Sequence, residues 1–260
     1  MPSQTREQSL RDYYSALYQR KTILAISSAL PGTPSYGFMR RRTTALREDI
    51  KEPNVNLLSI GPGHAVAELQ ILRQLRGAKL HTIDIAKVKP IWDVLAIEAK
   101  RDNREKTIEH AHRQVQGSAE ALPYLDNSMH IAVSAFALDH ATNPDRAASE
   151  LHRVLAPGGG AVILLTKYSD EFPEDFKKTL ASLRPTLRAL KKANAPAAKI
   201  KEAEIGIAGT EALLHSARNL PKNVNEAKRH FEKHGFKVTE AVELAGDNAA
   251  MGLVLRKPTA

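Results

Sequence analysis

The chain has 260 residues, of which 42% are hydrophobic and 5% aromatic, and no apolar run reaches the roughly 18 residues that span a bilayer. This composition predicts a soluble globular protein and excludes a membrane span. The absence of cysteine excludes disulfides, thiolate zinc sites and a cysteine nucleophile. It favours a reducing compartment, with the cytoplasm as the expected location.

The formal charge of +9 comes from 38 basic and 29 acidic side chains. Between Arg20 and Lys51 there are seven basic residues against two acidic ones, and residues 171–204 carry eight against five. Such clusters attract anionic partners, so RNA is one expectation. A solvated basic face is the alternative, because no interleaved aromatic residues accompany the charge.

Residues 1–52 are predicted to form an N-terminal helical segment. Its stretch "RDYYSALYQRK" places Tyr14 and Tyr18 one helical turn apart, where they either pack in the core or cover a ligand. The apolar run "TILAISSAL" predicts a packed helix rather than a secretory signal, because Glu7 and Asp12 precede it.

From about residue 55 onward, apolar strand patterns alternate with helical patterns. Strands are predicted at "VNLLSI", "LHTID", "QVQG", "HIAVSAF" and "AVILL", and the helix "HAVAELQILRQLRG" is predicted to end at Gly77. In "NPDRAASELHRVLAPGGG", Asn143 is the predicted cap and Leu155 belongs to the buried stripe of the helix. Asn223 and Glu226 predict a capping box for the last helix, and two further strands follow Gly235.

This order predicts an α/β fold with a doubly wound, mostly parallel, seven-stranded sheet. Residues 53–165 and 222–260 would form a cofactor-binding domain. Residues 166–221 would form a helical insertion, interrupted at Pro196, which with the N-terminal segment closes over the site as a lid.

The stretch "LLSIGPGHAVAELQIL" indicates where a ligand binds. Gly61, Pro62 and Gly63 follow the first strand, where glycines allow close approach of a ligand and the next helix offers free amide groups. Asp84 ends the second strand, where a carboxylate can bind both ribose hydroxyls. The pattern predicts an adenosine-containing cofactor, and Val66 disfavours a dinucleotide because that fingerprint needs a small residue there.

Residues 57–165 resemble the class I S-adenosylmethionine-dependent methyltransferases, and most closely the ubiquinone/menaquinone-biosynthesis-like branch. The specific part is "QGSAEALPYLDNSMHIAVSAFALDHATNPDRAASELHRVLAPGGGAVILL", with "AEALP", "DNS" and "RVLAPGG" in the order of that family. The resemblance implies S-adenosyl-L-methionine as cofactor and methyl transfer to a small or medium-sized organic acceptor. An RNA methyltransferase and a noncatalytic binding or assembly protein of the same fold are the alternatives.

The resemblance also implies roles for particular residues. Gly61 and Gly63 would line the methionine part of the cofactor, Asp84 would bind the ribose, Ser118 and Ala119 would meet the adenine edge, and Ala137 to His140 would lie near the methyl group. Tyr14 and Tyr18 would fold over the cofactor.

Four positions depart from the family pattern, at Ser59, Ala65, Ser118 and His130. The family usually has an acidic residue, glycine, aspartate and aspartate there. A neutral hydroxyl at Ser118 would be a weaker acceptor than a carboxylate. These departures are the reason to keep a noncatalytic relative open.

The chemistry of methyl transfer requires mainly positioning, and a base only if the acceptor loses a proton. Asp139 and His140 are the candidate bases, with a structural hydrogen bond as the alternative role of His140. The histidines predict no metal site. His230 and His234 are spaced i,i+4, but the sequence offers no third ligand beside them. The acceptor and the oligomeric state stay open.

Overall fold

A computed structural model describes residues 5–19, 32–63, 65–72, 74–75, 77–86, 112–246 and 250–259. The predicted helix at "TILAISSAL" lies outside these residues. Within them, seven strands form one sheet in the order β3-β2-β1-β4-β5-β7-β6. The strands are β1 (Val55–Ile60), β2 (Ala78–Asp84), β3 (His112–Gln116), β4 (Met129–Ala135), β5 (Leu155–Thr166), β6 (Lys237–Glu243) and β7 (Ala250–Arg256).

The sheet is mostly parallel, as predicted. Strands β1 to β5 pair in parallel, whereas β7 runs antiparallel to both β5 and β6. The strand order reverses between β1 and β4, and ligands of doubly wound sheets bind in the crevice beyond the carboxyl ends at such a point. The loops after β1, β2 and β4 therefore meet at one edge.

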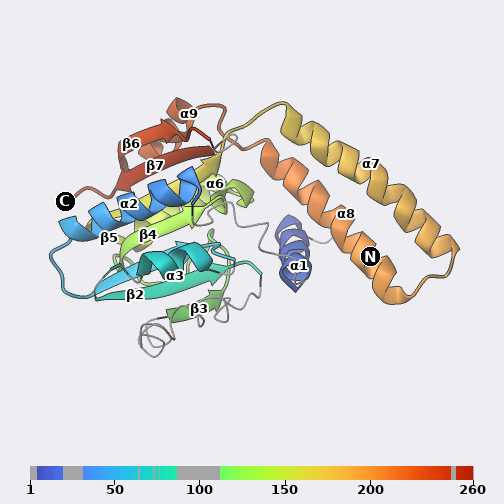
Figure 1. The fold of residues 1–260 in the computed structure, drawn as a ribbon, viewed down its shortest axis with the longest axis horizontal. Coiled ribbons are helices and arrows are strands. Elements are labelled where there is room, and N and C mark those ends of the chain that lie inside the picture. Colours follow the sequence, from blue (N-terminus) through green and yellow to red (C-terminus); the bar gives the residue numbers. More distant parts are fainter. Residues whose placement is uncertain are drawn as a thin grey trace.

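Helices cover both faces of the sheet (Figure 1). Helix α2 (Pro34–Asp49) and α3 (Val66–Leu72) share an apolar core with Leu57 and Val133. Helix α6 (Pro144–Val154) and α9 (Val224–Lys233) share another core with Leu58 and Ile163. Neighbouring residues of one strand point to opposite faces, so the nearly continuous apolar strands fill both cores.

Helix α2 corrects the expectation that all of residues 1–52 form an appendage. Phe38, Met39 and Leu46 on this helix are at most 3% exposed and pack against the sheet. Thr33 caps the helix by accepting a hydrogen bond from the Tyr36 amide at 3.2 Å. Helix α2 therefore packs on the sheet, and among the described residues before β1, α1 (Arg6–Gln19) is the helix that lies apart from it.

Two predicted helix ends also differ. Helix α3 ends at Leu72, and Gly77 has another reason to be glycine: a Cβ there would lie 2.1 Å from the Pro53 carbonyl oxygen. Helix α6 ends at Val154, and Leu155 already begins β5, so its burial is that of a strand residue. The caps are as predicted, with Asn143 accepting from the Arg146 amide at 3.0 Å.

The insertion forms a helical hairpin of α7 (Glu171–Lys192) and α8 (Ala197–Ala217), with the predicted break at Pro196. Figure 1 shows this hairpin extending from the sheet, with α1 against α8. The base of the hairpin is closed by the Tyr168 amide, which donates to the Pro221 carbonyl at 2.8 Å. Among the described helices, none is long and apolar enough to cross a membrane.

Candidate active site

The glycine turn after β1 is built from backbone that favours glycine. Gly61 and Gly63 have φ of +65° and +55°, in the left-handed region. A Cβ on Gly61 would lie 2.1 Å from the Ala137 Cβ, and one on Gly63 would lie 2.9 Å from the Tyr18 hydroxyl. The turn therefore touches both the loop after β4 and helix α1, which brings the predicted residues Gly61, Gly63, Ala137 and Tyr18 together.

Asp84 holds this turn from the end of β2. Its Oδ2 accepts a hydrogen bond from the Gly63 amide at 3.0 Å, and its Oδ1 accepts one from the Ala86 amide at 2.9 Å. The side chain is 5% exposed. These two bonds orient the Asp84 carboxylate against the glycine turn.

The departures at Ser59 and Ala65 have local explanations. Ala65 has φ of +57°, the conformation in which the family pattern has glycine, and alanine is the smallest residue that carries a Cβ. Ser59 donates a hydrogen bond to Glu68 of α3 at 3.1 Å, and both side chains are buried. The family usually has an acidic residue at position 59, and here the carboxyl group of Glu68 from α3 lies beside Ser59.

Glu68 is a site residue that the sequence analysis missed. Burial, with a smaller contribution from the nearby charge of Asp84, raises the pKa of this carboxyl group to about 7. The helical pattern gave no signal for it, since a glutamate in the first turn of an amphipathic helix is typical of a solvated helix start. Its contact with Ser59 becomes visible only when α3 is docked on the sheet.

Helix α1 forms a roof over this edge. The Tyr14 and Tyr18 rings are stacked with centroids 6.0 Å apart, and the Tyr14 ring lies 5.6 Å from that of His140. Burial raises the pKa of both phenols, and the charge of Asp84 raises each further. The i,i+4 pair predicted from the sequence therefore faces the glycine turn and the loop after β4.

Helix α1 is held in place by α8. A Cβ on Gly209 would lie 2.3 Å from Cγ of Tyr13, so the Tyr13 ring occupies the space beside this glycine. Arg6 is hydrogen-bonded to His215 of α8 at 2.8 Å and to the Thr142 carbonyl. The roof is thus a unit of α1 and the helical hairpin that also touches the loop before α6.

Asp139 and His140 lie in the short helix η2 (Leu138–His140) after β4. Asp139 is 6% exposed, and its Oδ2 accepts a hydrogen bond from the Thr166 amide at 2.9 Å. Its buried Oδ1 accepts none from any residue that the structure describes. Burial raises the pKa of Asp139 to about 7 and lowers that of His140 to about 4.

The two residues predicted to contact adenine, Ser118 and Ala119, lie in the loop after β3. Ser118 accepts a hydrogen bond from the Glu120 amide at 3.2 Å, and Ala119 packs against the core shared by α6 and α9. Glu120, which the sequence analysis did not select, accepts hydrogen bonds from the Thr142 hydroxyl at 2.6 Å and the Asn143 amide at 2.9 Å. This carboxylate ties the loop after β3 to the loop after β4, at the same edge of the sheet.

Other predicted features have structural roles. His130 accepts a hydrogen bond from the Asn56 amide at 3.0 Å, which joins the beginnings of β1 and β4 far from the glycine turn. Several residues of the basic clusters form ion pairs with carboxylates: Arg42 with Glu240, Lys177 with Glu174, Arg184 with Glu211 and Lys191 with Glu204. These pairs reduce the net positive field that favoured an RNA partner.

Known proteins share both the fold and part of the sequence. Residues 58–163 match the family model described as "Methyltransferase domain". The chain is 42% identical over 52 residues to the ubiquinone/menaquinone biosynthesis C-methyltransferase UbiE of Legionella pneumophila. The matched stretch covers 20% of this chain and 21% of that protein. The chain thus matches about a fifth of the length of this curated relative.

Two solved structures resemble the whole fold. The 1,6-didemethyltoxoflavin-N1-methyltransferase of Burkholderia thailandensis, solved with S-adenosylhomocysteine, is 13% identical with a TM-score of 0.59, over 99% of this chain and 92% of that one. The [4+2]-cyclase SpnF is 17% identical with a TM-score of 0.53, over 85% and 81%. At sequence identities this low, the two structures show that the fold is shared and nothing about activity.

The strand order is that of the Rossmann-like, class I methyltransferase fold. Residues 58–163 are a methyltransferase domain related to the ubiquinone/menaquinone-biosynthesis-like branch. The resemblance seen in the sequence is thereby confirmed.

Proposed function

We propose that this protein transfers the methyl group of S-adenosyl-L-methionine to a small or medium-sized organic acceptor by in-line displacement. The observation that carries the proposal is a cluster of buried acidic groups around the glycine turn. Glu68, Asp84 and Asp139 are at most 6% exposed, and they lie below the roof formed by Tyr14 and Tyr18.

This cluster fits a cationic ligand. Burial is the largest cause of the raised pKa of both Glu68 and Asp139, and no cationic side chain in the described part of the chain lowers either one. The buried Oδ1 of Asp139 accepts no hydrogen bond from the described residues. A ligand that carries positive charge and hydrogen-bond donors would compensate these groups. S-adenosyl-L-methionine has an ammonium, a sulfonium and ribose hydroxyls, and when bound it supplies an activated methyl group.

The chain's own residues then bind, orient and exclude water. Gly61 and Gly63 let Ala137 and Tyr18 pack directly against the turn that would hold the methionine part of the ligand, and Asp84 would bind the ribose hydroxyls. Ser118 and Ala119 would meet the adenine. Tyr14 and Tyr18 cover the edge, and excluding water strengthens the electrostatic contacts beneath them.

Of the two candidate bases, Asp139 is the better suited. With a pKa of about 7 it can hold a proton taken from an acceptor near neutral pH, whereas a pKa of about 4 makes His140 a weak base. His140 contacts the Tyr14 ring, so we assign it the positioning of the roof rather than proton transfer.

Calorimetric titration with S-adenosyl-L-methionine and S-adenosylhomocysteine tests the proposal. Asp84→Asn keeps one acceptor oxygen but removes the charge, and we expect about 10- to 150-fold weaker binding, equivalent to the loss of about 1.5–3 kcal/mol of charge-assisted hydrogen bonds. The control Asp175→Asn removes a carboxylate on exposed α7 and should leave the affinity unchanged. No binding by the folded wild-type chain would overturn the methyltransferase proposal.

A further inference from the structure

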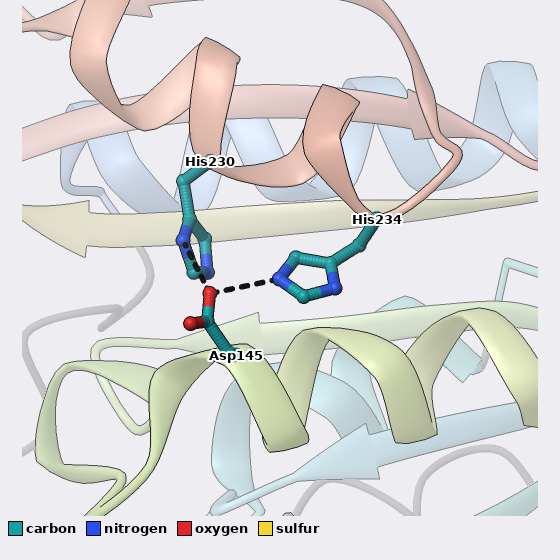
Figure 2. A group of neighbouring side chains, drawn as sticks. All are labelled: Asp145, His230 and His234. Carbon is teal, nitrogen blue, oxygen red and sulfur yellow. Dashed lines mark hydrogen bonds and ion pairs between the residues drawn. The ribbon is translucent and has the colours of Figure 1, made fainter.

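A second cluster of chemistry-bearing side chains lies between α6 and α9, on elements other than those of the glycine turn. Asp145 lies in the first turn of α6, His230 on α9, and His234 at the C-cap of α9. Figure 2 shows both imidazole rings pointing from α9 toward the Asp145 carboxylate. The two helices are held together beneath them, because Ala148 of α6 and Phe231 of α9 belong to the same apolar core.

The distances suit a single small cation. The His234 Nε2 lies 2.9 Å and the His230 Nδ1 lies 3.7 Å from Oδ1 of Asp145, and the three ligand atoms lie within 4.8 Å of one another. Bonds of about 2.0–2.1 Å to a tetrahedral zinc ion place neighbouring ligand atoms about 3.3 Å apart. The two distances to Asp145 bracket that value, and the limit of 4.8 Å on the remaining pair leaves the two imidazole rings to close around the ion.

The hydrogen bonds around His234 orient its ring. The Ser149 hydroxyl donates to the Asp145 carbonyl at 2.9 Å, so it can only accept at the 3.0 Å contact with His234 Nδ1. Nδ1 of His234 is then a protonated nitrogen, and Nε2 is the nitrogen that faces the Asp145 carboxylate at 2.9 Å. A cation bound by Nε2 and the carboxylate would replace the hydrogen bond between them, and a serine on the far nitrogen is the kind of partner that orients histidine ligands.

We propose that Asp145, His230 and His234 bind a divalent transition-metal ion of the zinc type, with water as the remaining ligand. The set of two imidazoles and one carboxylate is typical of zinc sites with an open position. The Asp145 side chain is 55% exposed and that of His230 is 31% exposed, so ion and water can enter from solvent. The ion would join α6 to α9.

Lys233 provides a sharp test of this proposal. Its ammonium lies 3.1 Å and 3.2 Å from the two carboxylate oxygens of Asp145, so it competes for the ligand group that the ion needs. Replacing Lys233 should make metal binding tighter if the ion occupies this site. If the cluster is only an ion-pair network, the replacement should instead weaken the network or leave it unchanged.

The experiment is a calorimetric titration of the chelator-treated full chain with Zn²⁺, combined with thermal unfolding. We expect one ion per chain and an unfolding midpoint that rises with Zn²⁺ concentration. Asp145→Asn, His230→Gln and His234→Gln should each weaken binding at least about tenfold, Ser149→Ala by about tenfold, and Lys233→Gln should strengthen it. Glu232→Gln, which removes a partly exposed carboxylate elsewhere on α9, is the matched control and should bind like the wild type.

The proposal is wrong if the wild-type chain binds no Zn²⁺ at micromolar concentration, which would leave a protonated His234 paired with Asp145. It is also wrong if His230→Gln and His234→Gln, each shown to be folded by a cooperative melting transition, bind Zn²⁺ as the wild type does.

Discussion

Replacing Gly209 by alanine tests whether the contact between α1 and α8 positions the roof. A glycine in the interior of a 21-residue helix is less favourable than alanine by about 1 kcal/mol, so its presence needs a structural reason. The reason is the Tyr13 ring, because a Cβ at Gly209 would lie 2.3 Å from Tyr13 Cγ. Carbon atoms in contact are normally about 3.5–4.0 Å apart, so α1 would have to move by more than about 1 Å.

Gly206 on the same helix gives the matched control. Its Cβ would meet only Leu183 Cδ1 at 3.6 Å, an ordinary contact. Gly206→Ala should therefore stabilise the chain by about 1 kcal/mol through helix propensity alone. Gly209→Ala gains the same propensity but pays for overpacking, which amounts to about 1–3 kcal/mol. The difference between the two variants isolates the Tyr13 contact.

Urea unfolding of both variants measures this difference, and calorimetric titration with S-adenosylhomocysteine measures the function of the roof. We expect Gly209→Ala to be about 1–3 kcal/mol less stable than Gly206→Ala. Only Gly209→Ala should bind the ligand more weakly, because displacing Tyr13 displaces Tyr14 and Tyr18. Equal stability and unchanged affinity in the two variants would refute the role assigned to this contact.

Three further predictions concern single side chains. Asp139 has a pKa of about 7, above its value of about 3.9 in an unfolded chain, so the native state holds this proton more tightly and the contribution of Asp139 to stability falls as pH rises from about 4 to 7. In urea unfolding, Asp139→Asn should therefore be more stable than the wild type at pH 8, by at most about 4 kcal/mol, and this gain should vanish near pH 4. Ser118→Asp should bind S-adenosylhomocysteine more tightly, because a carboxylate is the stronger acceptor for the adenine amino group; equal or weaker calorimetric affinity in a folded variant would remove Ser118 from the site. Gly61→Ala combines left-handed backbone strain with the clash against Ala137 and should lower the unfolding free energy by about 2–4 kcal/mol. Gly32→Ala, with φ of +98° and no described atom within 4 Å of the added Cβ, should lower it by only about 1–2 kcal/mol. Similar losses would show that the Ala137 contact is unimportant.

The sheet could be predicted because its signals are local. The apolar strand before Gly61, the Asn143 cap and the capping box at Asn223 each depend on residues within one turn of one another. The position of Asp84 followed from topology, since parallel strands end at the same edge.

The missed features depend on contacts between distant segments. The charged run Arg40 to Arg42 hid the buried face of α2, because it separates the adjacent Phe38 and Met39 from Leu46 on the same helix. Asp145 is 85 residues or more from the two histidines it meets, and such pairing follows only from the packing of α6 on α9. Glu68 likewise needs α3 docked against Ser59 before its carboxyl group is buried.

The hydrogen bond between Tyr168 and Pro221 has a consequence for how this architecture can vary. The chain leaves the sheet and returns to it at this one point, so the hairpin is connected to the sheet as a closed loop. The entropy of closing a loop changes slowly with length, by about 0.6 kcal/mol for each doubling. The part of the hairpin beyond its contact with α1 can therefore be lengthened or shortened with little penalty to the sheet. The α8 surface that meets α1 is different, because a change there moves the roof over the glycine turn.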